Sequence, residues 1–248
     1  MPTQIRQLFD PAKDIYRTIE KVITYSASQE ARLKAEITEY IVTDSITSDG
    51  LSEFIEQRGG VHHRFKRGYK NVINEAIRLN NEGKFCPLAI ETSGHAALKE
   101  NYFLDDGAYL VTKLLIELAH CKKRGVSLEA LIEDLKSAEE EAEIRMGFNT
   151  GDFTAYGTRV LEELTRYAYS TAGFSPAPVN FEGLRVSFDK DNGDGWFLLR
   201  LSLHDPIMPL NIESNTAGGA KVIAKKLYAF LQDFDGLDLK NLKSFIEG

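Results

Sequence analysis

The stretch at residues 88–95 reads LAIETSGH, a short apolar run that passes directly into a polar turn. Such a run predicts a buried strand. In an open α/β sheet, ligands bind beyond the carboxyl ends of the strands, so the turn is a candidate site. The carboxylate of Glu91 and the hydroxyl of Ser93 suit a polyol, and Gly94 lets a ligand approach the backbone. A polar turn with a helix cap explains the same residues equally well.

Strand-like and helical patterns alternate on both sides of this stretch. The apolar residues predict strands at 41–43 and 61–65 and helices at 49–56, 72–77 and 111–119. This order favours an α/β fold, with βα units around a mainly parallel mixed sheet. We place this domain at residues 1–138, and its first thirty or so residues also show a helical pattern.

The second half, residues 139–248, reads as a small α+β domain. It begins with the acidic stretch 139–143, which we expect to act as a linker between the two domains. The order β-α-β-β-β-α follows from strands at 144–148, 184–188, 196–203 and 210–214 and helices at 153–169 and 223–231. The Asp- and Gly-rich segment 189–195 lacks calcium-loop spacing and predicts a hairpin turn.

The composition of the chain argues against several classes of function. The chain has 248 residues, with 37 acidic and 30 basic side chains and a formal net charge of −7. This balance argues against a general partner of nucleic acid or of an acidic membrane. Cys86 and Cys121 form no disulfide or metal pattern. With no signal-peptide pattern and no membrane-spanning run, we expect a cytoplasmic protein without a metal site of its own.

A basic cluster lies before and within the start of the helix that carries Val72 and Ile77. Cations at a helix N-terminus make an anion site, although a solvated basic face is the commoner explanation. The cluster consists of Arg64, Lys66, Arg67 and Lys70. The adjoining His62 and His63 should face opposite sides of their strand, so we do not expect them to share a metal ion.

A second anion site is indicated in the C-terminal half. Period-two alternation along residues 196–203 places Arg200, Ser202 and His204 on one face. A guanidinium, a hydroxyl and an imidazole on one face can hold a phosphate, with the guanidinium supplying bidentate donors. An ordinary exposed strand face gives the same pattern.

From about Ile41 to its end, the chain resembles the bacterial phosphoglucomutase/phosphomannomutase family, the phosphohexomutases. Each motif is weak alone, but four in this order with family-like spacing are specific. The motifs are TDS at 43–45 with TSDG at 47–50, GYK at 68–70, ETSGH at 91–95 and RLSLHDP at 200–206. The resemblance implies the third and fourth of the family's four domains.

The resemblance also implies an activity. Family members are isomerases that interconvert hexose 1-phosphate and hexose 6-phosphate through a bisphosphate intermediate. Mg²⁺ and hexose 1,6-bisphosphate are expected for the complete enzyme, with the metal and the transferred phosphoryl group carried by the first two domains. We find neither of those motifs here, so we expect no turnover from this chain alone. The alternative is a non-catalytic module that binds a phosphosugar.

Roles carry over by resemblance onto individual residues. Glu91 and Ser93 would hold sugar hydroxyls, and Lys70 and His95 would approach the reacting end of the substrate. Substrate binding would also involve Arg67 in the basic cluster. Arg200, Ser202 and the backbone around His204 would hold the non-reacting phosphate.

The chain departs from the family pattern in the phosphate loop. His204 and Asp205 stand where threonine and glutamate are common. A second arginine is not evident downstream, where Asn211 lies nearby. The expected partners are a hexose phosphate and the missing N-terminal half, with no nucleic acid and no membrane.

Overall fold

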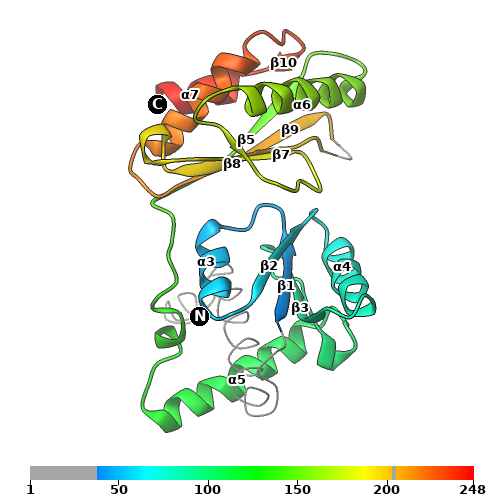
Figure 1. Ribbon diagram of the computed structural model, residues 1–248, viewed down its shortest axis with the longest axis vertical. Helices are drawn as coiled ribbons and strands as arrows, with labels where there is room; N and C mark the ends of the chain where they lie inside the picture. The colour runs from blue at the N-terminus through cyan, green and yellow to red at the C-terminus, as the bar shows by residue number, and fades with distance from the viewer. Residues whose placement is uncertain (1–37, 203–204) are drawn as a thin grey trace, which may run out of the picture. The chain divides into compact units, whose positions relative to one another are not determined.

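The computed structural model describes residues 38–202 and 205–248. The chain divides into two compact units between Lys136 and Ser137, each with its own sheet (Figure 1). The helical pattern of the first thirty residues lies outside the described part, and so does His204. Within that part, no helix is long and apolar enough to cross a bilayer.

The first unit is built on a four-stranded sheet. Its order is β2-β1-β3-β4, with β1, β2 and β3 parallel and β4 antiparallel to β3. The strands are β1 (Glu39–Asp44), β2 (Val61–Phe65), β3 (Phe85–Ile90) and β4 (Ala96–Leu98). The helices are α3 (Asp49–Gln57), α4 (Tyr69–Asn81) and α5 (Gly107–Arg124), with short 3-10 turns η1 (Lys99–Asn101) and η2 (Glu129–Ile132). The predicted mainly parallel mixed sheet is confirmed.

Both faces of this sheet are covered, because alternate residues of its strands are apolar on both sides. Ile41 of β1 packs in one buried cluster with Leu51 and Phe54 of α3. The next residue, Val42, packs in a second cluster with residues of α4. Figure 1 shows α3 and α4 on opposite sides of the sheet. Because β1, β2 and β3 are parallel, their carboxyl ends meet at one edge of the sheet. This edge lies between the helices that cover the two faces.

Helix α5 forms where the apolar stripe predicted a helix, but the side chains of that stripe are largely exposed. Its N-cap is Asp106, whose side chain accepts a hydrogen bond from the Tyr109 N–H at 3.0 Å. Cys121 is its buried residue, while Val111 and Leu115 remain 45% and 59% exposed. Periodicity predicts a helix with an apolar face, but contact with a neighbouring layer decides whether that face is buried.

The second unit is a six-stranded antiparallel sheet in the order β10-β5-β9-β8-β7-β6. Apolar residues of its strands form one buried cluster with the helices, which confirms the α+β class. The strands are β5 (Glu140–Phe148), β6 (Ser175–Pro176), β7 (Leu184–Phe188), β8 (Gly195–Leu199), β9 (Ile207–Ser214) and β10 (Leu237–Asp238). The helices are α6 (Phe153–Ser170), α7 (Gly219–Leu231) and α8 (Lys240–Glu247). A 3-10 turn, η3 (Lys190–Asn192), joins β7 to β8 where a hairpin turn was predicted.

The acidic stretch 139–143 is not a linker, because residues 140–143 begin strand β5. The carboxylate of Glu140 accepts hydrogen bonds from the N–H groups of Gly218 and Ala220, at 2.7 and 3.0 Å. These groups lie at the start of α7, where a negative charge is favourable. Glu140 is thus a strand residue whose carboxylate caps a helix elsewhere in the chain.

Strand β8 ends at Leu199, earlier than predicted. The N–H groups of Arg200 and Ser202 still donate to the carbonyls of Pro209 and Ile207, both at 3.1 Å. The two residues thus continue the pairing with β9 beyond the regular strand. The N–H groups of both residues face β9, as expected for alternate residues of a strand, at the start of the predicted phosphate loop.

Position 183 should require glycine, because its backbone lies too close to Leu199 and Arg200 for a side chain to fit. Its φ is +60°, and an added Cβ would lie 2.2 Å from the Leu199 carbonyl oxygen and 2.8 Å from the Arg200 Cα. We expect Gly183→Ala to destabilise the second unit by about 1–3 kcal/mol, as overpacking does. Urea unfolding followed by circular dichroism measures this loss.

Gly151→Ala is the matched control, since a Cβ added there would have nothing within 4 Å and its φ is not positive. It should leave the unfolding midpoint unchanged. Equal midpoints for the two variants would contradict the close approach at Gly183.

Candidate functional site

A buried carboxylate connects three loops at the carboxyl edge of the first unit. Asp44 ends the central strand β1 and is fully buried. It accepts hydrogen bonds from the hydroxyls of Thr47 at 3.0 Å and Thr92 at 2.7 Å. The Nε of Arg67 lies 3.8 Å from the Asp44 Oδ2. These partners come from the loops after β1, β3 and β2 respectively.

Burial has the largest effect on the pKa of Asp44. Loss of water raises the pKa of its carboxyl, and the nearby Glu91 raises it further. The hydrogen bonds from Thr92 and Thr47 and the charge of Arg67 act in the opposite direction and lower the pKa. The carboxylate thus depends on its three loops for the partners that replace water.

Glu91, predicted to bind a sugar, ties the loop after β3 to the start of α4. Its Oε1 accepts from the Gly68 N–H at 2.7 Å, and its Oε2 accepts from the Ser93 hydroxyl at 3.0 Å. The Glu91 N–H donates to the His95 carbonyl at 2.9 Å, and Gly94, at φ +93°, closes the turn. The predicted pair of Glu91 and Ser93 is therefore in direct contact. Glu91 itself is only 6% exposed.

Tyr69 lies beside both residues that the resemblance assigns to catalysis. Its ring stacks on that of His95 with centroids 5.1 Å apart, and the Lys70 Nζ lies 5.8 Å from its centroid. The Nδ1 of His95 lies 2.7 Å from the Asp105 Oδ2. An imidazole held through one nitrogen and half exposed can exchange protons with a ligand through the other.

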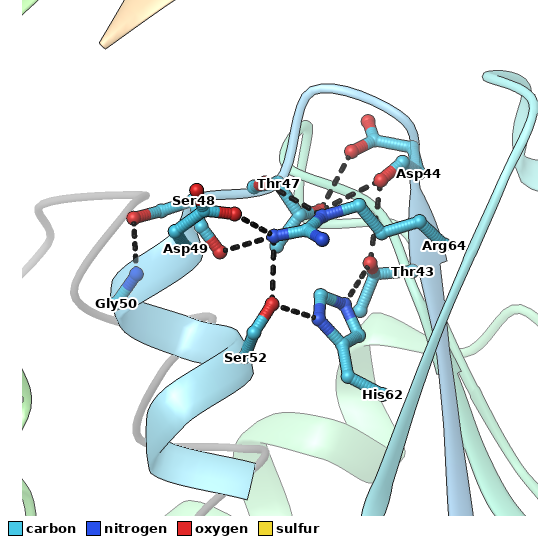
Figure 2. Close-up of polar contacts among 9 residues, drawn as sticks. All are labelled: Thr43, Asp44, Thr47, Ser48, Asp49, Gly50, Ser52, His62 and Arg64. Atoms are coloured by element: carbon cyan, nitrogen blue, oxygen red, sulfur yellow. Dashed lines mark hydrogen bonds and ion pairs between the residues drawn. The ribbon is translucent and has the colours of Figure 1, made fainter. Parts of the chain in front are cut away.

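Arg64 does not join the predicted anion site, which is a correction to the expected basic cluster. Figure 2 shows its guanidinium pointing toward the start of α3. Its Nε and Nη2 donate to the carbonyls of Thr47 and Ser48, each at 3.0 Å. Nη2 also contacts Asp49 and Ser52, both at 2.6 Å. A strand side chain that faces a helix start finds acceptors within the chain, so this arginine fixes the loop after β1.

The two adjacent histidines face opposite ways, as predicted. The ring of His62 lies between the hydroxyls of Ser52 and Thr43, each 2.6 Å from a ring nitrogen (Figure 2). His63 instead contacts the buried Glu75 of α4 at 2.8 Å. Burial lowers the pKa of His63, which opposes the effect of Glu75. Both histidines serve the packing of helices on the sheet.

In the second unit, the described part of the predicted phosphate loop has a turn-like structure. The Ser202 hydroxyl accepts from the Asp205 N–H at 3.2 Å. Asn211 is almost fully buried on β9 and pairs with Leu198 on β8, which pairs with Arg185 on β7. Arg185 is also buried, and its guanidinium lies 3.4 Å from the Trp196 ring centroid.

The described residues do not fit the Mg²⁺ that the family implies. In the two described ranges, no three His, Cys, Asp or Glu side chains are grouped so as to hold a metal ion. Asp44 and Glu91 each accept hydrogen bonds from loop N–H or O–H groups. We therefore derive no step of chemistry through a metal in this chain.

Known proteins resemble this chain in sequence. Residues 21–138 match the family described as phosphoglucomutase/phosphomannomutase, alpha/beta/alpha domain III. The phosphoglucomutase of Neisseria gonorrhoeae is 28% identical over 195 residues, which is 77% of this chain and 38% of that protein. The phosphomannomutase/phosphoglucomutase of Pseudomonas putida is 27% identical over 179 residues, 71% of this chain and 34% of that protein.

Solved structures show the same fold. A phosphoglucomutase/phosphomannomutase family protein from Burkholderia thailandensis has a TM-score of 0.65 and 23% identity, covering 90% of this chain and 43% of that one. Residues 21–138 thus match a phosphohexomutase domain, and the chain is similar to part of a phosphoglucomutase and of a phosphomannomutase/phosphoglucomutase. It spans well under half the length of the relatives that it matches.

The contacts of Glu91 predict a cost in stability as well as in binding. In Glu91→Gln, the amide carbonyl can still accept from the Gly68 N–H and the amide N–H₂ can donate to the Ser93 hydroxyl, but the negative charge is lost. We expect a loss of about 1 kcal/mol, as hydrogen bonds to a charged acceptor are replaced by neutral ones. Thermal unfolding compared with the wild-type chain measures it.

Glu53→Gln provides the control, because Glu53 pairs with Lys136 at the surface and such pairs contribute little. A Glu91→Gln chain as stable as the control would mean that the carboxylate does not hold the loop.

Proposed function

We propose that this chain is the sugar- and phosphate-binding part of a phosphohexomutase that interconverts hexose 1-phosphate and hexose 6-phosphate. Its first unit would correspond to the family's third domain and its second unit to the fourth. The hydrogen-bonded pair of Glu91 and Ser93 at the carboxyl edge of a parallel sheet carries the proposal. Ligands of open α/β sheets bind at this edge, and carboxylate and hydroxyl groups suit sugar hydroxyls.

The chemistry assigned to the chain is positioning and proton exchange. Glu91 and Ser93 accept from and donate to hydroxyls of the sugar ring, with Arg67 beside them. His95, oriented by Asp105, exchanges a proton with the reacting hydroxyl, and Lys70 supplies positive charge near the transferred group. Positioning and charge stabilisation are the main means of catalysis in phosphoryl transfer.

The second unit is proposed to hold the phosphate that does not react. Arg200, Ser202 and the backbone around His204 are assigned this role, since guanidinium groups bind phosphate in a bidentate way. Related structures support the ligand class. An N-acetylphosphoglucosamine mutase of Aspergillus fumigatus, with a TM-score of 0.53 and 10% identity, was solved with GlcNAc-6P and magnesium. A second structure of that mutase contains glucose 1,6-bisphosphate.

The remaining assignments follow from the same proposal. Mg²⁺ and hexose 1,6-bisphosphate would be needed by the complete enzyme, with the metal held outside the residues described here. The N-terminal part of the family's architecture is the proposed partner, and the cytoplasm, where hexose phosphates are metabolised, is the proposed location. The competing hypothesis is a module that binds a phosphosugar without turnover.

We expect the isolated chain to show no mutase turnover, because the groups that store the phosphoryl group and bind the metal are assigned to other domains. A coupled assay with glucose 1-phosphate, Mg²⁺ and glucose 1,6-bisphosphate tests this. Adding a separately produced N-terminal half of a related mutase should restore measurable activity. Turnover by the chain alone, after contaminating mutase is removed, would contradict the division of roles. Binding of a hexose phosphate with no activity in either arm would favour the non-catalytic module.

The phosphate role of Arg200 predicts a loss of affinity that depends on the ligand. Arg200→Ala should weaken binding of glucose 6-phosphate by about 1.5–3 kcal/mol, as expected for a charged hydrogen bond, and leave binding of free glucose unchanged. Titration calorimetry on both ligands gives the difference.

Arg166→Ala, on the exposed surface of α6, is the control for loss of one positive charge. If Arg200→Ala weakens binding of both ligands equally, or matches the control, the guanidinium does not bind the phosphate.

A further inference from the structure

We propose that Asp44 is a positioning residue, which orients the sugar loop, residues 91–95, by holding Thr92. The consequence for the ligand rests on the proposed function, but the positioning itself is a property of the chain without ligand. Asp44 was not among the predicted site residues, although it lies in one of the motifs that carry the family resemblance.

The topology places Asp44 where it can reach this loop. β1 lies between β2 and β3, so the residue that ends it is next to the loops that follow both neighbours. Thr43 pairs with Ile90 and Asp44 pairs with Phe65. A side chain at an outer strand could not contact both loops, because strands in a sheet are about 4.8 Å apart.

The contacts of Thr92 determine how the sugar loop is oriented. Its hydroxyl donates to the Asp44 Oδ2 at 2.7 Å, and its backbone N–H lies 3.4 Å from the same oxygen. The N–H belongs to the peptide group that joins Glu91 to Thr92, so this contact restrains the plane of that peptide. The hydroxyl restrains the Thr92 side chain. Together they fix the residue between Glu91 and Ser93, whose side chains meet at 3.0 Å.

The buried charge makes this restraint strong. A carboxylate without exposure must replace its water with hydrogen-bond donors, and losing one donor is costly. Thr47 and Thr92 each donate a hydrogen bond to Asp44, and the guanidinium of Arg67 supplies a positive charge from the loop after β2. The loop cannot move away from β1 without leaving a buried carboxylate short of a partner.

Amide hydrogen exchange of the full chain without ligand tests the positioning. The reporter is the Gly94 N–H, which donates to the Glu91 carbonyl at 3.0 Å inside the sugar loop. Thr92→Val removes the hydroxyl and keeps the shape, so we expect exchange at Gly94 to become about tenfold faster. Asp44→Asn should act in the same direction, and Thr92→Ser, which keeps the hydroxyl, should retain the wild-type rate.

Thr47→Val is the matched control, since it removes another hydroxyl from Asp44 without touching the sugar loop. Its Gly94 exchange should equal that of the wild type, while thermal unfolding shows whether each variant is folded. Equal exchange at Gly94 in Thr92→Val and Thr47→Val would overturn the role of Asp44.

A second measurement separates this inference from the proposed function. Titration with glucose 6-phosphate should show weaker binding in Thr92→Val and recovery in Thr92→Ser. Faster exchange at Gly94 with unchanged affinity would overturn sugar binding by the loop and leave the positioning intact. Unchanged exchange would overturn the positioning whatever the affinity.

Discussion

The carboxylate of Asp44, buried at the end of a central parallel strand, is the constraint on which the site of the first unit depends. Parallel pairing brings the ends of β1, β2 and β3 to one edge, and a charge buried there needs partners from the loops that follow. Thr47 and Thr92 donate hydrogen bonds to it, and Arg67 supplies a positive charge. Loops are usually the variable part of a fold, but each of these three contacts the same buried carboxylate, which holds it at this edge of the sheet.

Local periodicity predicted most of the secondary structure. The bounds of β2 and β7 agree with the predicted runs. The predictions failed where contacts between residues far apart in the sequence determine the structure. Glu140, predicted in a linker, lies in a strand and caps α7, and the apolar stripe on α5 remains exposed because no described layer of the unit covers it. Neither contact can be read from a window of neighbouring residues.

The same limit applies to the site. Glu91 and Ser93 were predicted from a strand that ends in a polar turn, and His95 from the family resemblance; the structure brings Glu91 and Ser93 into contact. Arg64 was grouped wrongly with an anion site, since a charge run shows neither the direction of each side chain nor the carbonyl groups of Thr47 and Ser48 that it meets. Asp44 was missed because its importance depends on burial and on partners up to 48 residues away in sequence.

The arrangement of Glu91 bears on how a sugar would be recognised. An ionised carboxylate offers about four acceptor positions, and the Gly68 N–H and the Ser93 hydroxyl occupy one on each oxygen. One position on each oxygen then remains for neighbouring hydroxyls of a ring, in an orientation already fixed before a ligand arrives. Such preorganisation lowers the entropy cost of binding, because the side chain and the turn that carries it are ordered in advance. A carboxylate that helps to fold its own loop can therefore also bind a polyol, and the two roles support one another.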